Sequence, residues 1–234
     1  MDTDSEDVKK DKDQLFEFVK AGYDRFEGDG SAELTWRLGR AFFKRAAAAE
    51  VAGDKKKLQE HLINAEKHVR RAVELDDGCS EAHVWLATVM GKRCDFLSSK
   101  ERIAAGKEVE LHLKRAIEIR SEDYVTFYTY GRWCFEVASL TWVERKLAAV
   151  MFGTPPEASF ADAMEKFRLV QKLKPEWKAN LFWMAKTAVC MKDYTTAIKL
   201  ADEAASVPSV DEEDVVSEKE IAAIQKKYAS YRSK

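Results

Sequence analysis

Apolar side chains recur along this chain at spacings of three, four and seven residues, the period of one face of an α-helix. Three segments align without gaps: RRAVELDDGCSEAHVWLA, KRAIEIRSEDYVTFYTYG and RLVQKLKPEWKANLFWMA. In each, one helical stretch ends and another begins, with equivalent apolar positions fourteen residues apart: Ala72 to Leu86, Ala116 to Tyr130 and Val170 to Met184. A junction repeated in this way predicts a series of antiparallel helical hairpins.

The hairpins differ in length although their junctions match. Leu38, Leu86, Tyr130 and Met184 occupy equivalent positions and are 48, 44 and 54 residues apart. Small residues at 197, 201 and 204 and prolines at 175 and 208 are typical of the tetratricopeptide repeat. We therefore expect an all-α fold, a tetratricopeptide-like right-handed superhelix of antiparallel hairpins with flanking cap helices.

The pattern also predicts where the domain begins and ends. Residues 1–12 form an acidic flexible N-terminus, and residues 13–231 form a single helical domain. The expected hairpins cover about 31–76, 80–120, 123–174 and 177–207. The first cap helix carries an apolar stripe that includes Leu15 and Phe18 and stops at Gly28-Asp29-Gly30. A capping-box pattern at Ser217 predicts a last cap helix at 217–231, with a loop at 211–214.

Charge is unevenly distributed along the chain. The net charge is −2, but residues 1–13 carry −3, residues 202–234 carry −3 and the body between them carries +4. This balance does not indicate a nucleic-acid-binding protein. The acidic ends are equally compatible with solvated tails and with a regulatory role.

Cysteine usage and hydropathy indicate a soluble intracellular protein. The cysteines at 79, 94, 134 and 190 are far apart and suit reduced thiols. The amino terminus has no apolar stretch of the kind found in a signal peptide. The longest apolar run, Leu147 to Phe152, is too short to cross a bilayer.

No pattern in the chain predicts catalysis, a cofactor or a metal site. The P-loop, nucleophile-elbow and zinc-protease motifs are absent. His61 and His68 are seven residues apart, but no carboxylate or cysteine stands at ligand spacing from them. His83 and His112 are isolated in the sequence. The sequence therefore favours a non-enzymatic protein.

The first helix of each hairpin supplies the candidate binding residues. The repeated positions Leu38, Leu86, Tyr130 and Met184 are expected to pack against the second helix of each hairpin. Residues two before, two after and five or six after these positions share one helix face, which lines the concave groove in tetratricopeptide proteins. Aromatic and basic residues alternate there. The candidate set is Trp36, Arg40, Phe43, Lys44, Lys92, Tyr128, Arg132, Phe182, Trp183 and Lys186.

Two interpretations of this face remain open. Cations beside aromatic rings suit an extended acidic peptide or an anionic lipid head group. Alternatively, the rings pack between neighbouring helices and the charges only keep the surface solvated. The basic residue repeated at one helical offset favours the binding interpretation.

Three segments resemble the regulator of microtubule dynamics family: LTWRLGRAFFKRA, RRAVELDDGCSEAHVWLA and YGRWCFEVASLTWVERKLAAVMFGTPPEASFADAMEKF. The resemblance covers roughly residues 31–206. It implies a tetratricopeptide-like body that associates with microtubules, through acidic tubulin tails, and acts at the spindle and its poles in chromosome segregation. It also implies a cytoplasmic and cytoskeletal location.

Two other functions remain possible at this stage. Some vertebrate relatives carry an amino-terminal membrane anchor and act at contacts between organelles, where the helical body can bind phospholipid. No such anchor is recognisable here, but a phospholipid-binding or lipid-transfer module using the same groove remains an alternative. A scaffold for another protein is the third possibility.

Overall fold

The computed structural model describes residues 3–26, 30–153 and 157–232, which contain α-helices, two short 3₁₀ helices and no strand. The first seven helices are α1 (Thr3–Phe26), α2 (Ala32–Val51), α3 (Lys55–Leu75), α4 (Ser80–Arg93), α5 (Ser99–Ile119), α6 (Tyr124–Ala138) and α7 (Trp142–Phe152). The remaining helices are α8 (Phe160–Leu173), α9 (Lys178–Cys190), α10 (Tyr194–Ser206) and α11 (Glu212–Lys227). The 3₁₀ helices are Cys94–Phe96 and Ala229–Tyr231.

Polar side chains fix where most of the helices begin. An N-cap oxygen satisfies backbone N–H groups that have no partner inside the helix. Such caps are Ser31, Asp54, Ser98, Asp123, Thr141, Ser159, Asp193 and Asp211. At Ser98, Thr141 and Ser159 an acidic residue three positions later completes a capping box.

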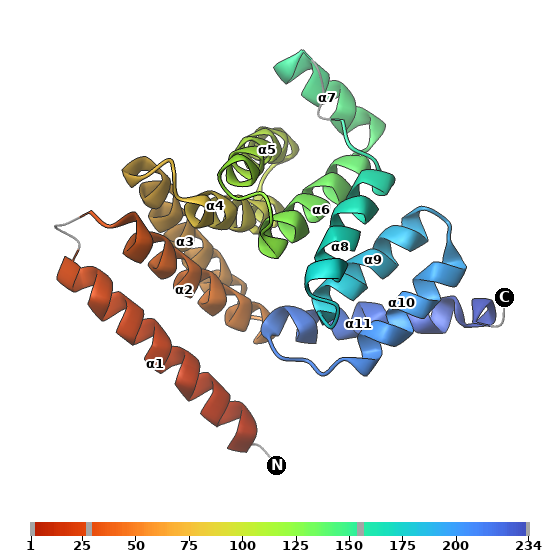
Figure 1. Cartoon of the computed structure of the whole chain (residues 1–234), viewed down its shortest axis with the longest axis horizontal. Coiled ribbons are helices and arrows are strands. Elements are labelled where there is room, and N and C mark those ends of the chain that lie inside the picture. The colour runs from red at the N-terminus through yellow and green to blue at the C-terminus, as the bar shows by residue number, and fades with distance from the viewer. Residues whose placement is uncertain (1–2, 27–29, 154–156, 233–234) are drawn as a thin grey trace.

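The helices form four consecutive antiparallel hairpins: α2 with α3, α4 with α5, α6 with α8, and α9 with α10 (Figure 1). The repeated junction lies at the centre of the packing, because Ala72, Ala116 and Val170 are fully buried. The residue fourteen positions after Ala72, Leu86, is also buried, on the adjacent helix α4. The predicted fold class, an all-α tetratricopeptide-like superhelix, is confirmed.

Two glycines allow helices to approach closely within these hairpins. A Cβ built at Gly131 would lie 2.6 Å from Cε1 of Phe167, so α6 and α8 cross in contact. A Cβ at Gly39 would lie 2.5 Å from Cγ1 of Val69, where α2 crosses α3. The positions are equivalent in the repeat, since each follows the aligned apolar residue of its first helix.

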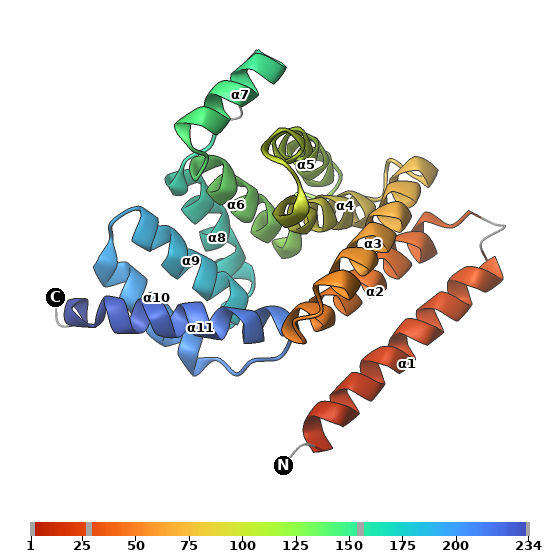
Figure 2. The same cartoon turned by 180° about the vertical axis from the view of Figure 1, so that it is seen from behind.

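Helix α7 is inserted between the two helices of the third hairpin and projects away from the body (Figures 1 and 2). It packs mainly against α5. Trp142, Val143 and Val150 on this helix are exposed. The longest spacing of the repeat, 54 residues between Tyr130 and Met184, therefore reflects a whole helix added to one hairpin.

The first cap helix differs from its prediction in two ways. Helix α1 begins at Thr3, so residues 3–12 are helical rather than a flexible tail. Residues 2–21 contain neither glycine nor proline, and nothing in the sequence interrupts the helix there. The buried aromatic is Phe16, whereas Leu15 and Phe18 are exposed, so the predicted stripe is wrong at these two positions. The predicted stop at 28–29 lies outside the described residues.

The last cap helix begins earlier than its prediction. Residues 212–214 form the first turn of α11 rather than a loop, and Asp211 is the N-cap. Ser217 is inside the helix, where its hydroxyl donates to the carbonyl of Asp214. Three acidic side chains in the first turn are favoured by the partial positive charge at a helix N-terminus, and this effect outweighs the capping-box pattern five residues later.

Candidate functional site

Three of the five predicted groove cations face one acidic segment of the same chain. Lys44 is on α2, Arg132 on α6 and Lys186 on α9, the first helices of the first, third and fourth hairpins. The N-terminal half of α11 lies against these helices. We call this surface, made by Lys44, Tyr128, Arg132, Lys178 and Lys186, the α11-docking face.

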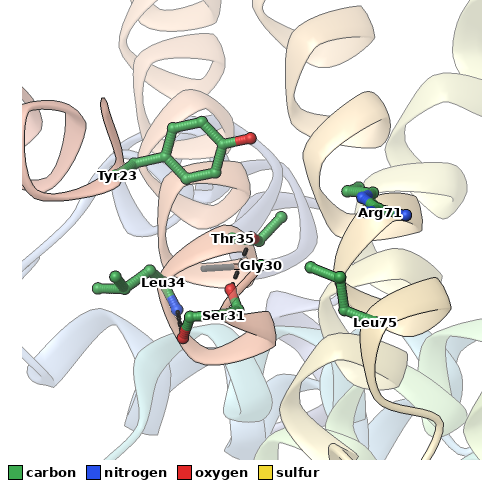
Figure 3. A pocket seen from close by; sticks show the side chains of 7 residues that line it. All are labelled: Tyr23, Gly30, Ser31, Leu34, Thr35, Arg71 and Leu75. Carbon is green, nitrogen blue, oxygen red and sulfur yellow. Dashed lines mark hydrogen bonds between the residues drawn. The ribbon is translucent and has the colours of Figure 1, made fainter. Parts of the chain in front are cut away.

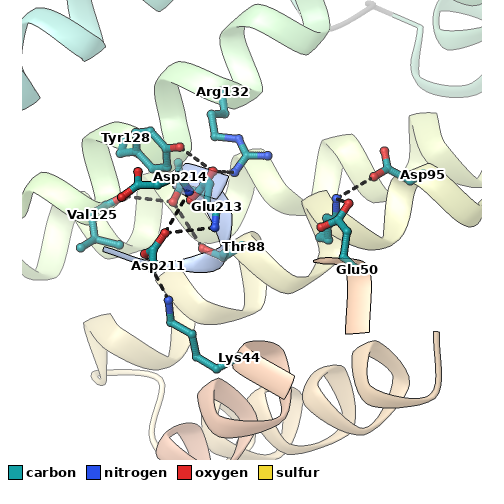
Figure 4. Close-up of polar contacts among 12 residues, drawn as sticks. Lys44, Glu50, Thr88, Asp95, Val125, Tyr128, Arg132, Asp211, Glu213 and Asp214 are labelled. Carbon is teal, nitrogen blue, oxygen red and sulfur yellow. Dashed lines mark hydrogen bonds and ion pairs between the residues drawn. The ribbon is translucent and has the colours of Figure 1, made fainter. Parts of the chain in front are cut away.

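The two central contacts join the first turn of α11 to α6 and α2 (Figure 4). Glu213 Oε1 accepts from Tyr128 Oη at 2.6 Å and from Arg132 Nη1 at 2.9 Å. Lys44 Nζ lies 3.5 Å from Asp211 Oδ2. Two carboxylates that are two residues apart in sequence are therefore held by cations from different hairpins.

Tyr128 is held so that its hydroxyl faces the acidic segment while its ring belongs to the core. The ring is buried and lies 4.4 Å from the ring of Trp177, centroid to centroid. Burial, and then the neighbouring carboxylate of Glu213, raises the pKa of Tyr128 well above its ordinary value. The phenol stays protonated at neutral pH and donates to the carboxylate.

Arg132 is positioned by aromatic rings as well as by charge. Its guanidinium carbon lies 4.8 Å from the ring centroid of Trp183 and 5.7 Å from that of Tyr128. The side chain is half-buried against these rings, and the guanidinium reaches Glu213. An arginine held by cation–π contacts loses less conformational freedom when it binds a carboxylate.

Helix α9 extends the docking face along the rest of α11. Lys186 Nζ lies 3.0 Å from Glu220 Oε2 and 4.9 Å from the ring centroid of Trp183. At the start of α9, the buried Lys178 donates to Ser209 Oγ at 2.9 Å and lies 3.5 Å from Glu218 Oε1. Each cation thus has a carboxylate of the segment 211–220 within ion-pair distance.

Asp214 is the one acidic residue of the first turn that is buried, and among the described residues no ion pair joins it to the cations of the face. Its Oδ2 accepts from the backbone N–H of Val210 at 3.0 Å, and its Oδ1 has no hydrogen-bond partner among the described residues. Burial raises the pKa of Asp214 above its ordinary value. A buried carboxylate with an unpaired oxygen opposes the docking of this turn.

The other two predicted cations do not meet α11. Lys92 Nζ pairs with Glu50 at 2.7 Å and with Asp95 at 3.3 Å, as Figure 4 also shows. The guanidinium of Arg40 is exposed and lies 5.4 Å from the ring centroid of Trp85. Arg40 forms no ion pair with any described residue.

Most of the predicted aromatic residues pack in the interior. Trp36, Phe182 and Trp183 are buried, so their rings do not line an open groove. Phe43 is half-buried with its ring edge against Trp85, at 5.8 Å between centroids. The packing interpretation of these rings therefore describes their place in the structure, while the basic residues among them remain at the surface.

One residue of the docking face, Lys178, and two acidic residues that the face contacts at the start of α11, Asp211 and Glu213, were absent from the predicted set. Lys178 was not counted because it stands at the start of α9, outside the repeated offset. Asp211 and Glu213 were assigned to a loop and a solvated tail. The charge imbalance between a body of +4 and an end of −3 was the signal that could have connected them.

The two histidines that are isolated in sequence meet between α4 and α5. His83 Nδ1 and His112 Nδ1 are 2.8 Å apart, so one ring must donate and the other accept. His83 Nε2 also lies 3.0 Å from the carbonyl oxygen of Asp77. Among the described residues, no cluster of three or more His, Cys, Asp or Glu side chains resembles a metal site.

A cavity of about 150 Å³ lies where the end of α1 meets the start of α2 and the end of α3 (Figure 3). Its lining residues are Tyr23, Gly30, Ser31, Leu34, Thr35, Arg71 and Leu75. The hydroxyls of Ser31 and Thr35 are engaged in the N-cap of α2. None of the predicted site residues lines this cavity.

The two most deeply buried cysteines are not activated nucleophiles. Burial raises the pKa of Cys94 to about 11 and that of Cys134 to about 12, so both thiols are protonated at neutral pH. The docking face instead offers ammonium, guanidinium and phenol donors, which bind carboxylates without chemical conversion.

No described helix is both long enough and apolar enough to span a bilayer.

The family model described as regulator of microtubule dynamics protein 1-3 matches residues 1–229. Regulator of microtubule dynamics protein 1 of Bos taurus is 28% identical over 202 residues, covering 86% of this chain and 63% of that protein. Regulator of microtubule dynamics protein 2 of Bos taurus is 29% identical over 215 residues, covering 91% of this chain and 51% of that protein. Regulator of microtubule dynamics protein 3 of Xenopus laevis is 31% identical over 183 residues, covering 78% of this chain and 39% of that protein. The chain thus spans less than two thirds of the length of these relatives.

Among solved structures, one described as the crystal structure of MamA superposes with a TM-score of 0.45 and 16% sequence identity. The superposition covers 95% of this chain and 98% of that chain.

Proposed function

The chain belongs to the regulator of microtubule dynamics family, and from this premise we propose that it is a non-enzymatic protein that binds microtubules through its α11-docking face. The partner is an acidic peptide segment, and the glutamate-rich tails of tubulin have the required chemistry. The names of the relatives support a role in microtubule dynamics.

The observation that carries the proposal is the way the face already holds carboxylates. Arg132 and Tyr128 share one glutamate, Lys44 holds an aspartate two residues before it, and Lys186 holds a second glutamate. The same donors at the same spacing would accept an acidic chain from another protein. The face is therefore selective for carboxylates arranged along a peptide.

The family also supports a more specific role. We propose that the protein acts in the cytoplasm on the cytoskeleton, at the spindle and its poles, and contributes there to chromosome segregation. Exposed ion pairs contribute about 0–1 kcal/mol each, so three such pairs supply at most about 3 kcal/mol, well below the roughly 8 kcal/mol of a micromolar complex. Weak, salt-sensitive binding suits a regulator that must exchange on and off a polymer.

The phospholipid alternative has less support at this face. An acyl chain needs exposed apolar side chains beneath a basic rim, whereas Trp36, Phe182 and Trp183 are buried in the core. An anionic head group alone would be held only by the cations. Binding to vesicles is therefore a separate arm of the test below rather than a second proposal.

The direct test reverses two charges of the face. The double variant Arg132→Glu with Lys186→Glu removes two cations and adds two anions on α6 and α9. Binding to microtubules, measured by co-sedimentation, should fall about tenfold or more, which corresponds to about 1.4 kcal/mol. Raising the salt concentration should weaken the wild type toward the variant, because exposed charges are screened beyond about 8–10 Å.

A matched control carries the same change of charge elsewhere. Lys55→Glu with Lys56→Glu alters two exposed lysines at the start of α3, outside the docking face. This variant should bind like the wild type. Circular dichroism must show both variants folded. If the control loses binding and the face variant keeps it, Lys55 and Lys56 make the contact with the microtubule and the proposal is wrong. Preferential binding of the wild type to anionic vesicles over microtubules would favour the lipid alternative.

A further inference from the structure

The segment from Asp211 to Glu220 occupies the positions that an acidic partner must use. Its carboxylates meet Lys44, Arg132 and Lys186, and Tyr128 donates its only hydroxyl hydrogen to the same segment. In Figures 1 and 2, α11 begins beside the end of α2 and runs past α9 to α10. An acidic peptide and this segment therefore cannot both make these contacts.

The two halves of α11 are held by different forces. The C-terminal half is anchored by packing: Tyr228 stacks on Tyr194 at 4.7 Å between ring centroids, and Ile221 is buried. Arg232, just beyond the helix, lies 2.6 Å from Asp202 on α10. This half forms part of the core and does not depend on the docking face.

Several of the contacts that hold the N-terminal half are ion pairs that water reaches. The side chains of Lys44 and Asp211 are 41% and 30% exposed, and those of Arg132 and Glu213 are 32% and 38% exposed. Pairs this exposed are weak and screened by salt. Asp214, with one unpaired buried oxygen beside two like-charged neighbours, further opposes docking.

We propose that residues 211–220 are a built-in competitor, and that an acidic partner binds by displacing them from the docking face. This inference rests on the proposed function. It defines the partner as a segment with carboxylates two residues apart, followed by a third about seven residues later, as in Asp211, Glu213 and Glu220. The affinity of the protein for such a partner is set by how readily the segment leaves, since the apparent affinity scales with the open fraction.

The test weakens the competitor while leaving the face intact. In the full chain, Glu213→Gln with Glu220→Gln removes two carboxylates that pair with Arg132 and Lys186. The probe is a fluorescein-labelled decaglutamate peptide, with decaglutamine as its uncharged counterpart, followed by fluorescence anisotropy. The variant should bind decaglutamate about five- to tenfold more tightly than the wild type, and decaglutamine should bind neither protein.

The matched control is Glu122→Gln with Glu176→Gln, which changes the net charge by the same amount. Both glutamates are exposed in turns, and neither forms an ion pair with a described residue. This control should bind decaglutamate within about twofold of the wild type, because exposed charges away from the face are screened. If the control gains as much affinity for decaglutamate as the competitor variant does, the gain comes from net charge alone, and the proposal is overturned.

Amide hydrogen exchange reports displacement directly. Adding decaglutamate to the wild type should speed exchange at residues 212–220 and leave 221–227 protected. Binding without any loss of protection at 212–220 would refute competition while leaving the proposed function in place. If decaglutamate binds none of the variants, the acidic-peptide function fails and the competitor with it.

Discussion

Tyr128 shows how one side chain can belong to the core and to a binding surface at once. Its ring is 5% exposed and packs on Trp177, while its hydroxyl lies at the boundary of the protein and donates to Glu213. Tyrosine suits this position because its apolar body and polar tip are separated by the length of the ring. Phenylalanine would keep the packing and remove only the contact with the acidic segment.

His112, whose ring contacts that of His83, gives the protein a predictable dependence on pH. Burial, and then the neighbouring His83, lowers the pKa of His112 below its ordinary value. Between the folded and unfolded pKa values of His112, the unfolded chain therefore binds more protons than the folded one. The contribution of His112 to stability is fully present above about pH 6.5, the ordinary pKa of histidine, and is lost as the pH falls through the lower folded pKa.

Urea unfolding at pH 7.5 and at pH 5.5 measures this effect. The free energy of unfolding of the wild type should be lower at pH 5.5, and the difference should shrink in His112→Asn, which keeps polar groups at this position without titrating. Burial also lowers the pKa of His61, so part of the dependence should remain in the variant. An equal pH dependence in the two proteins would show that the pKa of His112 does not change on folding.

At the scale of the element, the crossing of α6 and α8 depends on a single missing side chain. The ring of Phe167 is fully buried against Gly131, and a Cβ there would lie 2.6 Å from its Cε1. Glycine within a helix costs about 0.5–1 kcal/mol relative to alanine. The close approach of the two helices offsets that cost.

Gly131→Leu should therefore destabilise the protein by about 1–3 kcal/mol through overpacking, although leucine is the better helix former. The matched control is Gly106→Ala in the middle of α5, where an added Cβ meets nothing within 4 Å. The control should be neutral or stabilising by up to about 1 kcal/mol. Thermal melts compare the three proteins, and a Gly131→Leu variant as stable as the wild type would contradict the crossing.

At the scale of the whole molecule, α11 connects the two ends of the series of hairpins. Its C-terminal half packs on α9 and α10, and its first turn reaches α2 through Asp211 and Lys44. The segment that occupies the docking face is thus also the contact between the first and the last hairpin (Figures 1 and 2). Release of residues 211–220 should change the shape of the protein as well as free its cations.

Lys44→Glu tests this connection, because it replaces attraction to Asp211 by repulsion. Small-angle scattering should give a larger radius of gyration than for the wild type, while the free energy of unfolding changes by only about 0–1 kcal/mol, as for an exposed pair. The control Lys57→Glu breaks a pair with Asp54 within the same hairpin and should leave the radius unchanged. Equal radii for the two variants would mean that α11 does not tie the hairpins together.

The local pattern of the sequence was sufficient to predict the fold. Helical periodicity, N-cap residues and the constant junction are properties of neighbouring residues, so the all-α class and the four hairpins followed from the pattern. The repeat also gave Arg132 and Lys186 the same helical offset, and both of them face α11 in the structure. Residues 3–12 and 212–214 were assigned to a flexible tail and a loop because of their charge, whereas both segments are helical.

What the cations face was decided only by the tertiary structure. Arg132 and Glu213 are 81 residues apart in the chain, and no periodicity connects them. Whether an aromatic residue such as Trp183 lines a surface or fills the core depends on the helices packed around it, which a single helical offset does not specify. An ion pair between distant residues forms when packing brings them together, so the sequence determined the helices and their repeated faces, and the path of α11 across those faces determined which charges meet.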